Sequence, residues 1–146
     1  MKLERLELAP DESVLATSNA SFRGAAGGSV RAGAALGASR ARHESFITWR
    51  DQASRLGFPT AGQDMRLVLT NQRLIVCRTS FWLTRPVGVA GSLPLADVAE
   101  VAIVRQPMLT GVALAIKHKG IVELEAVRGR RLRRLARLMQ EAIASR

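Results

Sequence analysis

Alternation of apolar and polar residues dominates residues 63–127 and predicts a series of β-strands. Short runs of this kind occur in pairs, and a break of two residues separates the runs of each pair, as in a hairpin. The pairs are residues 65–70 and 73–78, residues 87–95 and 98–104, and residues 110–118 and 121–127. In the last pair one face is apolar and the other polar, which predicts an antiparallel sheet with one buried face.

Two segments show helical periodicity instead. Residues 39–56 carry apolar residues at intervals of three to four and predict an amphipathic helix, which Gly57 would end. Its apolar positions are Phe46, Trp49, Ala53 and Leu56. Residues 129–146 predict a second helix, with an apolar stripe on one side and arginines over the rest. Its apolar positions are Leu132, Leu135, Met139, Ala142 and Ile143.

The N-terminal part predicts one strand followed by an insertion. Residues 13–22 favour a strand, with a short helix as the alternative, and residues 23–62 form a loop rich in glycine and alanine that leads into the first helix. Residues 1–146 therefore predict a single domain, mainly β with helices. About seven strands would leave open edges unless they curl into a barrel or sandwich, and the terminal helix would cover one open end.

Four short motifs follow one another along the predicted strands. Residues 67–76 contain Thr70-Asn71-Gln72-Arg73-Leu74 between two apolar runs, residues 93–98 read Leu-Pro-Leu-Ala-Asp-Val, and residues 109–114 and 120–124 form the last pair. In this order they resemble the bacterial pleckstrin-homology-like domains, close to the GRAM-like branch. The resemblance implies a two-sheet, partly open barrel of about seven antiparallel strands with a C-terminal capping helix. It carries over no catalytic residue, and the helical insertion after the first strand departs from the family.

The charge of the chain is strongly positive, with a formal net charge of +10 at pH 7. Of the 22 basic residues, all but Lys2, Lys117 and Lys119 are arginines. A GC-rich genome would produce such a skew, and so would selection for an anionic partner. Net charge therefore bears on partners rather than on the fold.

Patterns for catalysis, metal binding or membrane crossing are absent from the sequence. One cysteine and two histidines are too few for an ordinary zinc site, and no HExxH, CxxC or EF-hand spacing occurs. Cys77 lies in an apolar strand and is predicted to be a buried, unreactive thiol. We expect no enzyme activity, cofactor or metal. Without a signal peptide or a spanning segment of about 18 apolar residues, we expect a cytoplasmic location, with membrane contact only peripheral, at the inner face.

Two basic segments are the candidates for anion or membrane binding. The first is the inserted helix, whose apolar side either lies on a membrane or packs on the barrel or on a second copy of the chain. Its candidate residues are Arg40, Arg42, Phe46, Trp49 and Arg50. The second is the final helix, where Arg130, Arg131 and Arg134 form either a solvated face or an anion-binding surface.

These features predict a non-catalytic binding or scaffold module. It would act through contacts with a protein partner or through peripheral association with an anionic membrane. The alternative is a basic nucleic-acid-binding protein that uses the arginine-rich C-terminal helix. Residues 129–146 contain no aromatic residue on which a base could stack, so only nonspecific phosphate contact is supported there. The identity of the partner and the oligomeric state stay open.

Overall fold

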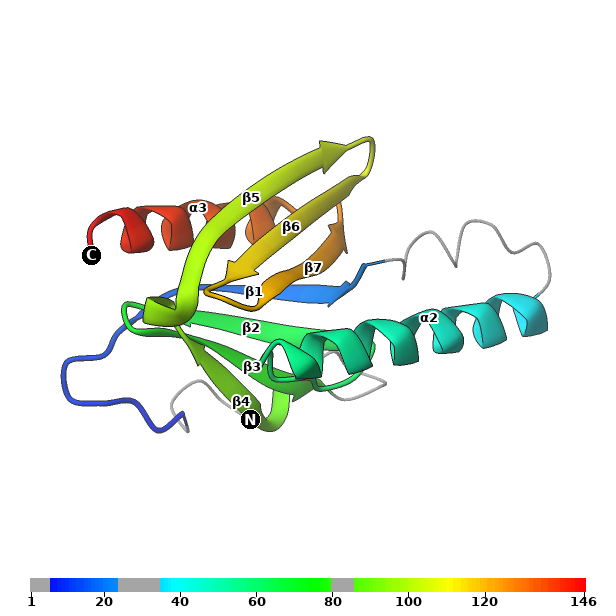
Figure 1. Ribbon diagram of the computed structural model, residues 1–146, viewed down its shortest axis with the longest axis horizontal. Helices are drawn as coiled ribbons and strands as arrows, with labels where there is room; N and C mark the ends of the chain where they lie inside the picture. Colours follow the sequence, from blue (N-terminus) through cyan, green and yellow to red (C-terminus); the bar gives the residue numbers. More distant parts are fainter. Residues whose placement is uncertain (1–5, 24–34, 80–85) are drawn as a thin grey trace.

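The computed structural model describes residues 6–23, 35–79 and 86–146, with side chains from His43 onward in the first helix and from Val87 onward in the fourth strand (Figure 1). The elements are β1 (Val14–Phe22), α2 (Ala35–Arg55), β2 (Asp64–Thr70), β3 (Arg73–Thr79), β4 (Pro86–Pro94), η2 (Leu95–Asp97), β5 (Val98–Gln106), β6 (Leu109–Ile116), β7 (Gly120–Val127) and α3 (Arg130–Ala144). The predicted first strand and terminal helix are confirmed. The inserted helix begins four residues earlier than predicted and is followed by Gly57 at a φ of 83°.

All seven strands form one antiparallel sheet in the order β4-β3-β2-β1-β7-β6-β5. Along most of its length β1 pairs with β2, but it pairs with β7 only at Ser21 and Phe22. The sheet therefore bends at β1 into two halves and forms a partly open barrel (Figure 1). The predicted hairpins β2–β3 and β6–β7 are confirmed.

The predicted hairpin of residues 87–95 and 98–104 is wrong. Instead, β4 pairs with β3 and β5 pairs with β6, so the two strands lie at opposite edges of the sheet. The short 3-10 helix η2 separates them, and Leu95 within it is buried. The chain leaves one half of the sheet there and enters the other, so the break at Ala96-Asp97 is a corner and not a hairpin turn.

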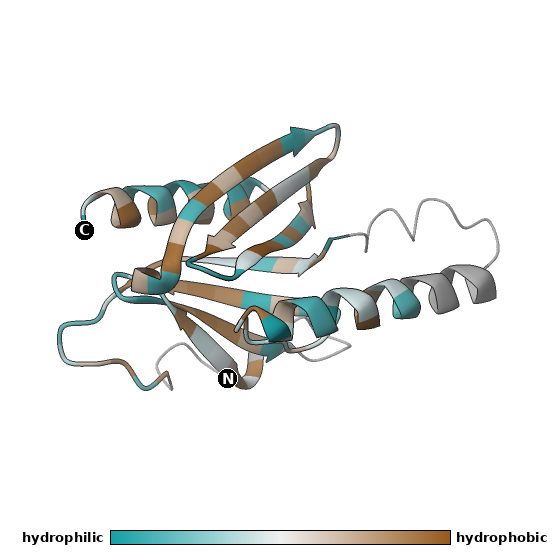
Figure 2. Cartoon of the chain, in the orientation of Figure 1, coloured by the Kyte–Doolittle hydropathy of each residue, from teal (hydrophilic) through white to brown (hydrophobic). Residues whose placement is uncertain are grey.

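The core lies inside the bent sheet, where the inward residues of the strands meet one stripe of α3 (Figure 2). Leu132, Leu135 and Met139 of this stripe are fully buried. The helix packs on β1, β5 and β6 and is tied to β5 by Gln140, whose Nε2 donates to the carbonyl oxygen of Val101 at 2.7 Å. The predicted capping role of the terminal helix is therefore confirmed.

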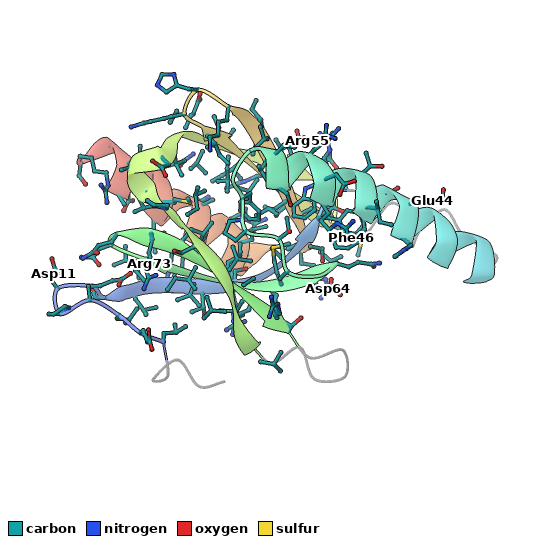
Figure 3. The ribbon with its side chains drawn as sticks, turned by 60° about the horizontal axis from the view of Figure 1, so that its bottom comes forward. Asp11, Glu44, Phe46, Arg55, Asp64 and Arg73 are labelled. Atoms are coloured by element: carbon teal, nitrogen blue, oxygen red, sulfur yellow. The ribbon has the colours of Figure 1, made fainter. Side chains whose placement is uncertain are left out.

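The inserted helix α2 packs on the barrel, which is one of the positions considered for it from the sequence. Phe46, labelled in Figure 3, and Trp49 are each only 8% exposed, and both belong to the main core. Their rings lie 5.4 and 6.2 Å from the ring of Phe22, and Trp49 meets Phe58 edge-on at 6.1 Å. The indole Nε1 of Trp49 also donates to the carbonyl oxygen of Glu123 at 2.8 Å, which satisfies its polar group.

A buried ion pair fastens the N-terminal segment to the β2–β3 hairpin. Glu12 accepts from the Nε of Arg73 at 2.8 Å and from the hydroxyl of Thr70 at 2.7 Å. Asn71 closes the same junction, since its Oδ1 accepts from the backbone N–H of Ser13 and its Nδ2 donates to the carbonyl of Asp11. Figure 3 labels Asp11 and Arg73 at this end of the sheet. The family-like turn motif is thus a structural fastening.

The segment held by this fastening covers the outer face of the β2–β3 hairpin. Leu6 packs there on Val68, Ile75 and Cys77, in a cluster separate from the main core. The predicted burial of Cys77 is confirmed, and burial raises the pKa of its thiol.

Candidate anion-binding surface

The periodicity of α3 gathers its arginines on the side away from the core. Leu132, Leu135, Ala136 and Met139 are buried, whereas the arginines of α3 are exposed, apart from the half-buried Arg133. On β5, Val101 and Ile103 pack in the core. Arg105 follows Ile103 by two residues, and because side chains alternate along a strand, it lies on the same face, which α3 covers. Together the two elements line a depression of about 560 Å³, called here the arginine groove. Its lining residues are Arg105, Arg130, Arg131, Arg133, Arg134 and Arg137.

The arginine groove collects positive charge without a balancing carboxylate. Within the described part of the chain, none of its six guanidinium groups forms an ion pair. Arg133 donates to neutral acceptors only, the hydroxyl of Thr110 at 3.3 Å and the carbonyl oxygen of Arg128 at 3.5 Å. Glu141 is the one acidic residue of α3 and lies near its C-terminal end. An anion that entered the groove would relieve the mutual repulsion of these charges.

Apolar side chains are exposed where the β5–β6 hairpin turns and where β7 ends, close to Arg105 and Arg128. This group is called here the hairpin tip, and its residues are Val104, Met108 and Val127. Met108 is 70% exposed and Val127 is 64% exposed. Arg105 precedes Met108 by three residues, and the backbone N–H of Arg128 donates to the carbonyl oxygen of Met108 at 2.8 Å. The hairpin tip therefore follows Arg105 closely along the chain and contacts the backbone of Arg128.

The backbone of the tip adopts an unfavourable conformation for its residue type. Met108 has a φ of 60°, in the left-handed region that side chains other than glycine rarely occupy. Glycine would relieve the strain but would remove the exposed thioether chain. His118 and Arg128, with φ values of 62° and 60°, share this conformation, so it is a feature of several turns of the chain.

The structure brings part of the predicted site together. Arg130, Arg131 and Arg134 all line the arginine groove. Arg50 lies on α2, on another side of the sheet in Figure 1, where it contacts Asp51 at 3.3 Å and the ring of Phe46 at 6.0 Å. The side chains of Arg40 and Arg42 lie outside the described residues.

The hypothesis that Phe46 and Trp49 contact a membrane is contradicted by their position. Both rings are buried in the core, and the indole hydrogen bond to β7 fixes Trp49 in place. To reach a bilayer they would have to leave contacts with Phe22 and Phe58, which would open the core. Their helical spacing reflects packing on the barrel.

Sequence reasoning missed Arg105. The period of two along β5 could have placed it on the face of Val101, but only the docking of α3 on β5 brings it beside the other arginines. The hairpin tip was missed too, because an isolated methionine between two strands carries no periodic signal.

Two absences complete the picture of the described residues. No three histidine, cysteine, aspartate or glutamate side chains come together in a way that could hold a metal ion. Among the described helices, none combines the length and apolar character needed to cross a membrane.

Comparison with known proteins identifies the fold. Neither a protein-family model nor a curated protein matches the sequence. Among solved structures, the Vps36 N-terminal PH domain is similar, with a TM-score of 0.53 and 14% sequence identity over 95% of this chain and 84% of that chain. The chain thus has a pleckstrin-homology-like fold, as its motifs implied. At this identity the comparison shows the fold alone, so the GRAM-like branch and the bacterial origin stay predictions.

Proposed function

We propose that this protein is a non-catalytic binding module that associates peripherally with an anionic membrane surface through the arginine groove and the hairpin tip. Its fold supports a binding or scaffold module in general, because pleckstrin-homology-like domains are generally non-catalytic. The matching location is the cytoplasm, at the inner face of the membrane. The observation that carries the proposal is the juxtaposition of unpaired arginines and an exposed apolar tip.

The arginine groove supplies long-range attraction. A basic side chain near an anionic bilayer contributes about 1 kcal/mol, and this attraction falls off within a Debye length. With six guanidinium groups on one side of the molecule, several would reach the headgroup layer at once. Charge alone would give binding that is easily reversed by salt.

The hairpin tip supplies the apolar part of the interaction. Complete burial of a methionine side chain is worth about 1.5–3 kcal/mol, and Met108 is still 70% exposed in the protein alone. A bilayer offers hydrocarbon to such a side chain, whereas a nucleic-acid backbone does not. The exposed large apolar residues of the described chain include no aromatic ring for base stacking. The tip therefore favours a membrane over nucleic acid.

Co-sedimentation with vesicles tests the proposal. We expect the protein to sediment at low salt with vesicles of phosphatidylglycerol and phosphatidylcholine but not with phosphatidylcholine alone. The Arg130→Glu/Arg134→Glu variant should lose about tenfold or more in affinity. The matched control is Arg55→Glu/Arg78→Glu, which changes the net charge equally at exposed positions outside the arginine groove. Met108→Gln should weaken binding several-fold without changing the charge.

Three results would overturn the proposal. The first is that the wild-type protein stays in the supernatant at low salt. The second is that the control variant loses as much binding as the groove variant. The third is displacement of the protein from the vesicles by duplex DNA present at an equal concentration of phosphate. That displacement would favour the nucleic-acid-binding alternative.

A further inference from the structure

A second concave site lies between the first turn of α3 and strands β1 and β2. It has a volume of about 240 Å³ and is called here the first-turn pocket. Its polar lining residues are Ser18, Asn19, Arg66, Arg128, Arg130 and Arg131. It shares Arg130 and Arg131 with the arginine groove, and it adds Arg66 and the neighbouring polar residues of the sheet as one wall.

Arg66 is half-buried and held in place by neutral partners. Its two terminal nitrogens donate to Asn19 Oδ1 and to Thr17 Oγ1, each at 3.0 Å. These contacts use two of the five N–H donors of a guanidinium group. Among the described residues, Arg66 has no carboxylate partner within ion-pair distance. A positive charge is thus fixed at the wall of the pocket with donors to spare.

The first-turn pocket also brings positive charges together. Burial and the nearby charge of Arg131 both lower the pKa of Arg66, and arginine remains charged at any physiological pH. The first turn of α3 contains no acidic residue, and no side chain caps it. Gathering cations around a partly enclosed space is unfavourable unless an anion occupies it.

The geometry points to a phosphate monoester group as the ligand of the first-turn pocket, bound by Arg66 and Arg131. A planar guanidinium fork matches the oxygen atoms of a phosphate group and binds it more strongly than neutral donors do. A terminal phosphate presents three oxygens and about two negative charges, which suits several converging arginines better than the single charge of a diester. The group could belong to a soluble phosphate compound or to a lipid headgroup.

Only the lipid source rests on the proposed membrane function, so we separate the two. The soluble arm titrates the protein with inorganic phosphate and with glycerol phosphate at constant ionic strength, following by NMR the backbone amide signals of Ser18, Asn19 and Gly129, which line the pocket and are unchanged in every variant. We expect saturable binding that Arg66→Gln weakens about tenfold or more and that Arg66→Lys restores only in part. Arg131→Gln, an exposed substitution that leaves the core intact, should weaken binding several-fold.

The control variant is Arg78→Gln, which removes an exposed arginine from the neighbouring strand and should bind phosphate like the wild type. The inference is overturned when chloride at equal ionic strength gives the same shifts as phosphate. It is equally overturned when both the Arg66→Gln and Arg131→Gln variants bind phosphate as the wild type does.

The lipid arm compares vesicles that contain phosphatidic acid with vesicles that contain phosphatidylglycerol at matched surface charge. If the phosphate group belongs to a lipid headgroup, the wild type should prefer vesicles with phosphatidic acid. Arg66→Gln should abolish this preference but keep the attachment through the arginine groove. Phosphate binding that depends on Arg66, without any vesicle binding, supports the pocket with a soluble ligand and refutes the membrane function. Vesicle binding without phosphate binding supports the membrane function and refutes the phosphate site in the first-turn pocket.

Discussion

Replacement of Glu12 by glutamine removes the negative charge at the junction between the N-terminal segment and the β2–β3 hairpin. The side chain of Glu12 is 1% exposed, and its carboxylate accepts from Arg73, Thr70 and the backbone N–H of Ala9. Glutamine has nearly the same shape but offers one neutral acceptor in place of two charged oxygens. The change therefore probes the charge of the fastening with little effect on packing.

The pKa of Glu12 sets the expected magnitude. Its hydrogen bond with Arg73 is the largest cause that lowers this pKa from 4.5 to about 2, against the opposing effect of burial. At about 1.4 kcal/mol per pKa unit, the shift corresponds to roughly 3 kcal/mol of stability. Because the Arg73 side chain is 31% exposed, solvent screening reduces the expected loss in Glu12→Gln to about 2 kcal/mol.

The sign of the pH dependence follows from the lowered pKa. The ionised carboxylate contributes its full stability above the unfolded pKa of 4.5, and this contribution is lost as the pH falls through 4.5 toward 2. The wild type and Glu12→Gln should therefore differ most near neutral pH. Around pH 2 the protonated glutamate resembles glutamine, and the difference should nearly vanish.

Urea unfolding followed by circular dichroism at several pH values between 2 and 7 measures this difference. Glu44→Gln, at an exposed position of α2, is the control and should change stability by less than about 0.5 kcal/mol. A difference between wild type and Glu12→Gln that stays constant with pH would refute the reasoning, because it would come from shape and not from charge.

Two further predictions concern the core. Leu135→Ala should destabilise the protein by about 2–5 kcal/mol in urea unfolding, because Leu135 lies on the buried face of α3 and is only 2% exposed; an unchanged midpoint would mean that α3 is not docked there. Cys77 should react slowly with a thiol reagent in the native protein and rapidly in denaturant, because it is fully buried and burial raises its pKa. Rapid labelling of the folded protein would contradict this burial.

Most of the strands could be predicted from sequence because their inward and outward residues alternate. Leu114 and Ile116 on β6 and Val122 and Leu124 on β7 are buried as expected. The pairing of β4 and β5 could not be predicted in the same way. A two-residue break looks alike whether the chain reverses into a hairpin or turns a corner, and only the closure of the whole sheet distinguishes the two cases.

The inserted helix shows a second limit. Its apolar stripe was predicted correctly, but a stripe of Phe46, Trp49 and Ala53 suits a bilayer and a protein core equally well. The helix packs on the core because the barrel provides a matching apolar surface. This surface is formed by Phe22 at the end of β1 and by Phe58 beyond the helix. These aromatic residues are separated along the chain, and no local pattern connects them.

The turn motif of residues 70–74 is the opposite case, because its residues could be recognised in the sequence but their structural role could not. Thr70 and Arg73 meet Glu12 across 58 and 61 positions of the chain. A short motif in two adjacent strands thus derives its meaning from a third segment that it holds in place. This explains why it indicated the fold but not a binding site.

The arginines of the arginine groove and the first-turn pocket differ from these cases, because none of them forms an ion pair with a carboxylate among the described residues. Arg105 comes from β5, Arg66 from β2, Arg128 from the turn before α3 and the others from α3. The sequence could show the charge of the last helix but not that Arg105 and Arg66 lie beside it. Arg23, Arg50 and Arg73 each contact a carboxylate, which shows that this fold can balance arginines where structure requires it. A GC-rich genome would explain a large number of arginines but not the convergence of these arginines on one groove and pocket, where the described residues provide no counter-charge. That convergence is the strongest physical reason to expect an anionic ligand there.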